Sequence, residues 1–180
     1  CGFRLDAQAT PKDRLTFQGG AFAAEGRELQ QLPTPDPPYT ALDAYDLKSH
    51  GGNLLGRWVR SAGEPTLFTM QGYVDRTVRE QPPYLGRAAQ TVADLEIKHR
   101  FAAGKHHNVV WGAGGRLNHT DVTGAYPGSV VPARRNTHLL TGFVQDEIAP
   151  GAGRLRVTVG TKVEQETFAG LSLQPNVRVL

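Results

Sequence analysis

The chain has 180 residues, long enough for one domain with a sizeable core, and its 20 basic and 17 acidic residues give a net charge of +3 with histidine neutral. Hydrophobic residues make up 39% of it, and no stretch approaches the ~18 consecutive apolar residues of a membrane helix. The composition therefore excludes a helical membrane protein. Although the pI is about 9.2, the charges are scattered and form no basic stripe with aromatic residues, so we expect no nucleic-acid partner.

Strict alternation of apolar and polar residues dominates the sequence, and it predicts strands with two different faces. In chain order we predict about nine strands, near residues 2–10, 13–24, 45–62, 65–79, 90–103, 106–120, 136–149, 153–167 and 173–180. In the fifth of these, Leu95 and Ile97 point to one side while Glu96 and Lys98 point to the other. Helices are not expected, because apolar residues do not recur at helical spacing and glycine and β-branched residues interrupt the patterned segments.

The connections between these strands are alternately short and long. Tight turns rich in Gly, Pro and Asp are predicted near 11–13, 62–65, 103–105 and 150–153, and longer loops near 25–44, 80–90 and 120–135. Every second turn of an up-and-down sheet lies on the same edge, so one edge has tight turns and the other open loops, with the last connection, at 168–172, as the candidate exception. This asymmetry predicts an all-β fold, an antiparallel up-and-down meander of about nine strands that is part of a larger transmembrane β-barrel.

A soluble antiparallel β-sheet, acting as a binding module or structural protein, is the alternative, because it shows the same alternation. It predicts that Leu95, Ile97, Phe68, Leu155 and Val157 converge in a dry core. Two features favour the membrane barrel: charged residues lie deep within the strands, and several strands exceed the usual soluble length of about 5–6 residues.

Several segments resemble strands of TonB-dependent outer-membrane receptors. They are residues 51–58 (GGNLLGRW), 71–76 (QGYVDR), 110–114 (VWGAG), 142–148 (GFVQDEI) and 159–164 (VGTKVE). The last two, in that order around a short turn, are the most specific, and residues 174–178 resemble the start of a further strand. The similarity runs over most of the chain.

This resemblance implies a bacterial outer-membrane location and contact with outer-membrane lipid. It implies uptake of a scarce small-molecule ligand, such as a ferric siderophore, with energy delivered by TonB through a plug domain. Family members have about 22 strands around a plugged lumen. We recognise no plug and no TonB-contacting segment, so residues 1–180 are interpreted as a partial barrel domain from the middle of such a receptor.

Enzymatic chemistry finds no support in the sequence. A Gly-x-Ser-x-Gly nucleophile motif, a phosphate-binding loop and zinc-ligand spacing are all missing. Neighbouring carboxylates such as Asp146 and Glu147 alternate along a strand and point to opposite faces. His106 and His107 make a poor chelate for the same reason. We therefore expect no catalytic residue, no metal and no cofactor.

Ligand contacts are instead predicted in the long loop near 120–135 and at the loop ends of its strands. The candidates are Tyr126, Arg134, Arg135, His119 and His138, which carry the charge and ring atoms to hold an anionic ligand or a haem. Ordinary solvated loop residues are the alternative interpretation.

Two further patterns concern the faces of the strands. Trp58, Trp111, Tyr73 and Tyr84 are candidates for an interfacial aromatic girdle, with ordinary strand packing as the alternative. On the polar face, we expect Arg57, Arg76 and Arg116 to pair with Asp75, Asp94 and Glu96 on neighbouring strands.

The first residue, Cys1, is the only cysteine, so an intrachain disulfide is impossible. It is interpreted as a fragment boundary, since alternation begins at once in residues 2–6. A lipid-bearing N-terminus is the alternative, and no signal peptide is recognised.

Overall fold

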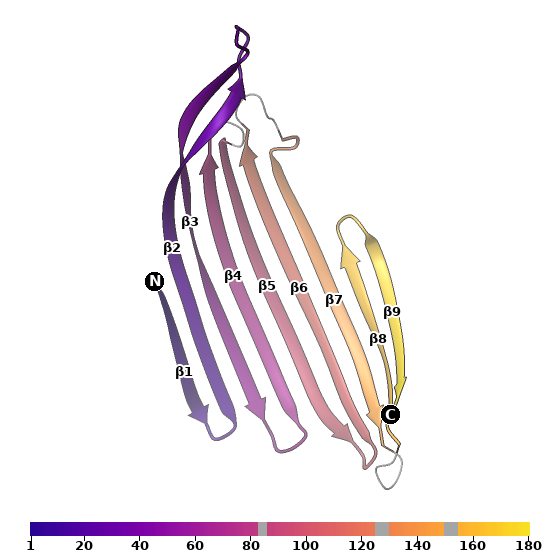
Figure 1. Ribbon diagram of the computed structural model, residues 1–180. Helices are drawn as coiled ribbons and strands as arrows, with labels where there is room; N and C mark the ends of the chain where they lie inside the picture. Colours follow the sequence, from indigo (N-terminus) through magenta and orange to yellow (C-terminus); the bar gives the residue numbers. More distant parts are fainter. Residues whose placement is uncertain (83–85, 125–129, 150–154) are drawn as a thin grey trace.

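The computed structural model describes residues 1–82, 86–124, 130–149 and 155–180. It is one antiparallel sheet of nine strands in sequence order, β1 to β9, as expected for an up-and-down meander (Figure 1). The strands are β1 (Gly2–Thr10), β2 (Asp13–Pro33), β3 (Thr40–Ser61), β4 (Leu67–Gln81), β5 (Gly86–Ala103), β6 (His107–Thr123), β7 (Arg134–Ile148), β8 (Val157–Glu166) and β9 (Gly170–Val179). The predicted all-β fold class is therefore confirmed.

The predicted open loop at 25–44 is wrong. β2 and β3 continue as a two-stranded ribbon, paired from Glu25↔Lys48 to Pro33↔Thr40, and only residues 34–39 connect them. This ribbon rises beyond the rest of the sheet (Figure 1). The prolines that suggested a loop all lie within residues 33–38, so they interrupt only the tip, where proline cannot donate a ladder hydrogen bond.

The two edges of the sheet differ, although not as simply as predicted. Connections 11–12, 62–66 and 104–106 lie on one edge, here called the tight-turn edge, and Gly63 and Gly104 supply its left-handed backbone positions. On the opposite or loop edge, β4 ends at Gln81 and β5 already begins at Gly86, so the long loop predicted at 80–90 is wrong. The 167–169 connection is short, in line with the exception expected for the last turn. The long connections on this edge are the β2–β3 ribbon and residues 124–133 between β6 and β7. The predicted turn at 150–153 lies outside the described residues.

Register separates the side chains into two faces, because directly paired residues on neighbouring strands point to the same side. One row across all nine strands reads Leu5, Phe17, Gly56, Gly72, Leu95, Gly115, Leu140, Gln165 and Leu171. The next row, one residue along each strand, reads Asp6, Thr16, Arg57, Gln71, Glu96, Gly114, Thr141, Glu164 and Ser172. We call the sides carrying these two rows the apolar face and the polar face.

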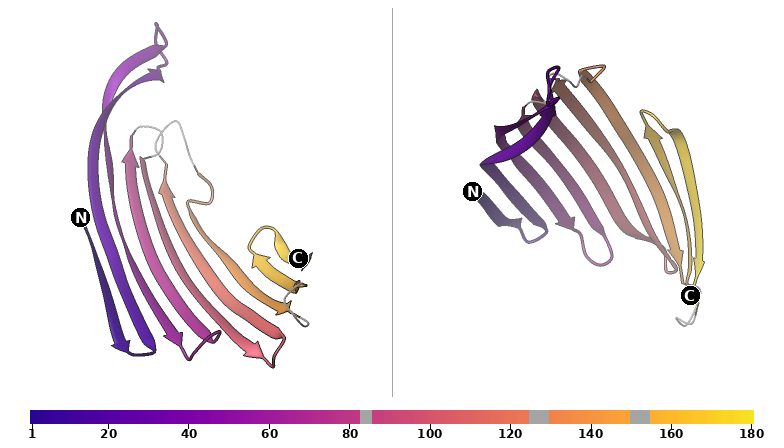
Figure 2. Two further views of the ribbon diagram at one scale, coloured as in Figure 1. Left: turned by 60° about the horizontal axis from the view of Figure 1, so that its bottom comes forward. Right: turned by 45° about the horizontal axis from the view of Figure 1, so that its top comes forward.

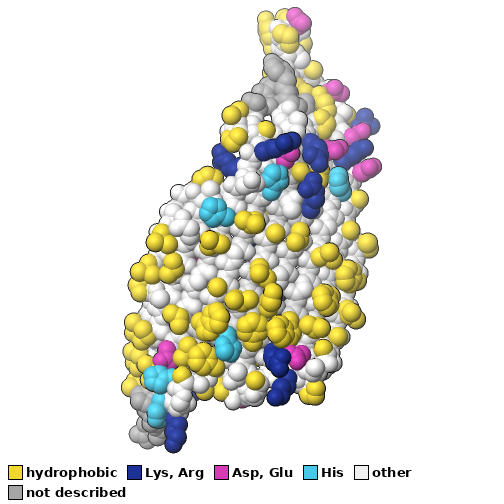
Figure 3. Space-filling view, turned by 180° about the vertical axis from the view of Figure 1, so that it is seen from behind, with side chains coloured by type: hydrophobic (Ala, Val, Ile, Leu, Met, Phe, Trp, Pro, Cys, Tyr) yellow, Lys and Arg dark blue, Asp and Glu magenta, His cyan; other side chains and the backbone are white. Residues whose placement is uncertain are grey.

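The sheet is bent across its width like part of a barrel wall, with β8 and β9 curving toward the side seen in Figure 1 (Figure 2). The apolar face is seen from behind in Figure 3, so it lies on the convex side and the polar face on the concave side. β1 and β9 pair with one neighbour each, and the described residues form an open sheet.

This single layer has almost no core of its own. Among the described residues, the buried hydrophobic side chains are Val78, Ala89 and Val110. Leu95 is 49% exposed, and Leu95, Ile97 and Phe68 share one open face instead of converging in a dry interior. The packing that the soluble alternative requires is therefore absent from the described part of this chain.

Candidate functional site

A broad apolar band covers the middle of the convex face. Its large side chains include Leu54 of β3, Val74 of β4 and Leu117 of β6, which are 62%, 50% and 64% exposed. Figure 3 shows these hydrophobic groups gathered between charged residues near both ends of the sheet. A contiguous apolar surface of this kind marks contact with another apolar phase or partner.

The length of the band suits a membrane. On β6 it runs from Val109 to Leu117, and on β5 from Phe101 to Ala89, with no Asp, Glu, Lys or Arg on this face in either stretch. A transmembrane β-strand needs about 9–11 residues when it is tilted. The uncharged stretches of β5 and β6 therefore have the length required to cross the hydrocarbon layer.

An aromatic row borders the band toward the tight-turn edge. Ring centroids lie 5.4 Å apart for Trp58 and Phe68, and 6.1 Å apart both for Phe68 and His99 and for His99 and Trp111. This row crosses β3 to β6 in neighbouring register positions. Tryptophan favours the boundary between apolar and aqueous phases, because its ring is apolar while its N–H needs a partner.

Trp58 shows both properties. Its indole Nε1 donates to the Oδ1 atom of Asp13, 2.9 Å away beside the turn at 11–12. Hydrogen bonds from Thr10 and from Trp58 hold the pKa of Asp13 below its usual value. Of the other predicted girdle members, Tyr73 lies on the polar face, paired with Leu55 and Asp94. The prediction that Tyr73 belongs to the girdle was therefore wrong, because alternation along β4 places it on the opposite face from Phe68. Tyr84 lies outside the described residues.

Pairs of charged or polar side chains border the band at both ends. Toward the tight-turn edge, Arg60 lies 3.7 Å from Asp13, and the Nδ1 atom of His107 lies 2.5 Å from a carboxylate oxygen of Asp146. Toward the loop edge, Arg134 pairs with Asp121 at 3.1 Å. Charged and polar residues therefore lie at the two ends of the band, as they do in the strands of transmembrane barrels.

The polar face carries charge through the middle of the strands. Arg116 donates to Asp94 at 2.9 Å, as predicted, and Lys162 lies 2.7 Å from Glu164. Arg57 donates to the Gln71 amide oxygen at 2.7 Å instead of to a predicted carboxylate. Such a surface requires water or a polar partner on the concave side.

Arg76 corrects one prediction. It pairs in register with Gly52 and Thr91 and therefore lies on the apolar face, opposite to Asp75. Its Nη1 atom donates to the Thr91 hydroxyl at 2.9 Å. The strand alternates strictly, so an even-numbered residue of β4 cannot share a face with Asp75.

The predicted ligand residues do not form one cluster in the described part of the chain. His119, His138 and Arg134 lie on the apolar face near the loop edge, and their partners are Asn136 at 2.6 Å, Thr167 at 3.2 Å and Asp121. Arg135 is one residue further along β7, on the polar face, with its guanidinium 5.3 Å from the Phe168 ring centre. Tyr126 lies outside the described residues, and the ligand assignment stays a prediction.

The described residues contain no group of three His, Cys, Asp or Glu side chains that could hold a metal ion. No helix in the described part of the chain is long and apolar enough to cross a membrane.

The fold and its two faces define a class, a long antiparallel meander of the kind that forms the wall of a β-barrel. No family model and no curated protein matches the chain. Among solved structures, it is similar to the siderophore receptor PirA from Pseudomonas aeruginosa, with a TM-score of 0.57 and 12% sequence identity. The match covers 99% of this chain and 35% of that receptor. At this identity the likeness shows a shared fold with part of a receptor.

Proposed function

We propose that this chain is part of the barrel wall of a bacterial outer-membrane receptor, with its apolar face against lipid and its polar face toward the barrel interior. The observation that carries the proposal is the uncharged band on the convex face, bordered by aromatic and ionic residues. Alternation of lipid-facing and interior-facing residues along every strand is the pattern of transmembrane barrels.

The polar face supports the second half of the proposal. Pairs such as Arg116–Asp94 and Lys162–Glu164 are partly exposed and lie on the concave side, which suits a water-filled interior better than hydrocarbon. A receptor barrel uses this surface to guide a polar ligand past the wall. Catalysis forms no part of the proposed role.

The proposed ligand is a scarce small molecule such as a ferric siderophore, taken up with energy from TonB. The fold shared with a siderophore receptor supports the ligand class. Within the predicted set, Arg135 is on the polar face and is the proposed contact, together with Tyr126. We do not propose ligand contacts for His119, His138 and Arg134, because their face is the one assigned to lipid.

Fluorescence quenching by brominated lipids tests the membrane orientation. The chain has two tryptophans, Trp58 and Trp111, and both belong to the aromatic row on the apolar face. In vesicles, we expect bromine near the lipid carbonyl groups to quench their emission more strongly than bromine at the chain ends. The membrane assignment would be wrong if neither lipid quenched the emission and the chain were a β-rich monomer in plain buffer.

A further inference from the structure

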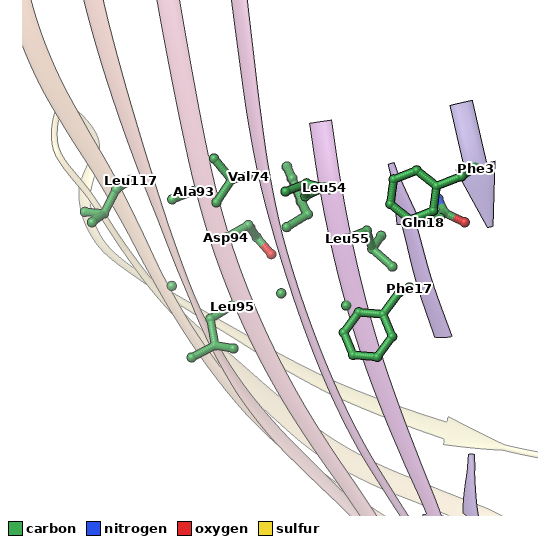
Figure 4. A pocket seen from close by; sticks show the side chains of 14 residues that line it. Phe3, Phe17, Gln18, Leu54, Leu55, Val74, Ala93, Asp94, Leu95 and Leu117 are labelled. Carbon is green, nitrogen blue, oxygen red and sulfur yellow. The ribbon is translucent and has the colours of Figure 1, made fainter. Parts of the chain in front are cut away.

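A groove crosses the apolar face between β2 and β6, and its volume is about 530 Å³. Its walls are Phe17, Leu54, Val74, Leu95 and Leu117, with Phe3 at one end (Figure 4). Ligand clefts typically measure about 300–1,000 Å³. The groove is therefore large enough to hold part of a molecule.

Glycines make the floor of this groove. Gly56 and Gly72 are directly paired, and they lie in the row between Phe17 and Leu95. A Cβ built on Gly72 meets no atom closer than 3.4 Å, and one on Gly56 meets the Phe17 ring at 3.5 Å. Backbone packing thus leaves room for side chains at both positions. Glycine here keeps the groove open.

A cation, Arg76, lies on the loop-edge side of the groove, two residues beyond Val74 on the same face of β4. Phe3, Leu54 and Val74 also line a second hollow, which continues from the groove and is bordered by Arg76. Arg76 forms no ion pair with any of the described residues. Its hydrogen-bond partner is the neutral hydroxyl of Thr91. Arg76 therefore borders the hollow next to the groove, near the end of the uncharged band, and its guanidinium has no carboxylate partner in the described part of the chain.

We propose that this surface is a binding site for one anionic phospholipid, with an acyl chain in the groove and its phosphate at Arg76. The inference rests on the proposed membrane orientation and adds a specific lipid site to it. Charge complementarity selects the occupant, because a lipid joins an apolar chain to an anionic group. Guanidinium binds phosphate well through charge-assisted hydrogen bonds.

Native mass spectrometry of the whole chain, released from micelles containing phosphatidylglycerol or phosphatidylcholine, tests the site. We expect one retained phosphatidylglycerol, and we expect Arg76→Gln and Gly72→Leu each to lower its retained fraction at least about tenfold. Arg87→Gln and Gly142→Leu are the matched controls. Both controls lie on the apolar face outside the groove, and Gly142 has open space for a side chain. Both should retain the lipid.

Several results would overturn the lipid site. These are equal retention of the two lipids, equal losses in Arg76→Gln and Arg87→Gln, or equal losses in Gly72→Leu and Gly142→Leu. Tryptophan quenching by brominated lipids, measured on the same variants, separates this failure from a failure of the proposed function. If the tryptophans are quenched but no lipid is retained, the membrane orientation holds and only the lipid site is wrong. If there is neither quenching nor lipid retention, both the orientation and the lipid site are wrong.

Discussion

At the scale of single residues, position along the strand decides what each side chain contacts. Leu54 and Leu55 are adjacent and chemically identical, yet register places Leu54 on the apolar face beside Val74 and Leu55 on the polar face beside Tyr73. The same rule separates Arg134 from Arg135. In a membrane, one member of each pair would face lipid and the other the barrel interior. The same substitution at both members therefore compares the two faces with residue type held constant.

Leu54→Arg should destabilise the chain in lipid vesicles by about 2–3 kcal/mol, because it places a charge in the hydrocarbon layer. Leu55→Arg should cost less than about 1 kcal/mol, since its side chain reaches the wet concave side. Urea unfolding followed by tryptophan emission measures both. Equal losses in the two variants would contradict the assignment of the faces.

Arg135→Ala should weaken binding of a radio-iron-labelled ferric siderophore about tenfold or more, because it removes the cation proposed to meet the anionic ligand. Arg134→Ala is the matched control and should leave binding unchanged, since Arg134 pairs with Asp121 on the other face. Equilibrium retention of the label by the membrane-inserted chain gives both values. A loss of siderophore binding in Arg134→Ala alone would contradict the proposal, because it would place the ligand on the apolar face.

At the scale of elements, the ribbon formed by the ends of β2 and β3 is the most independent part of the sheet. In the strand pairing of the described residues, Gly26 to Leu47 pair with each other alone, because β3–β4 pairing begins at Lys48 and β1–β2 pairing ends at Gly20. Large side chains on it are exposed, among them Leu29 and Leu42 at 69% each. An isolated two-stranded ribbon has little stability of its own.

Replacing residues 26–47 by Asn-Gly should therefore leave the remaining sheet folded, with thermal stability changed by less than about 1 kcal/mol. Glu25 and Lys48 are directly paired, so a two-residue hairpin turn can join them. Far-UV circular dichroism during heating in detergent measures the effect. Collapse of the whole β signal would show that the ribbon supports the sheet through contacts beyond its own pairing.

At the scale of the whole molecule, one layer of nine strands buries little by itself. β4, β5 and β6 each have partners on both sides, whereas β1 and β9 each present one unpaired edge. Exposed strand edges favour pairing with other chains. Lipid can cover the convex face, but it cannot supply hydrogen bonds to an edge.

Amide hydrogen exchange in detergent should therefore be slowest in β4, β5 and β6 and fastest at the outer edges of β1 and β9. Central amides need several strands to separate before they exchange, while an unpaired edge is already open. Mass spectrometry of peptic fragments resolves these regions. Uniform protection in β1 and β9 would mean that a second copy or another segment covers the edges.

Much of the fold could be predicted from local sequence. The period of two placed Leu95 and Glu96 on opposite faces, and glycine, proline and aspartate marked the tight turns. The predictions failed where the local signal was ambiguous. Prolines confined to 33–38 were taken for a loop extending over 25–44, because the exposed ribbon around them has no buried face to impose a clear alternation.

By itself, the sequence determined that the chain forms strands and that consecutive side chains point to opposite faces, one apolar and one polar. These features depend only on the two-residue period of the strand backbone. The tertiary structure decided which residues of different strands share a row. It aligned Trp58, Phe68, His99 and Trp111 into one border, divided the predicted ligand residues between two faces, and opened the groove over Gly56 and Gly72. Such rows depend on register, which is set by pairing between strands distant in sequence.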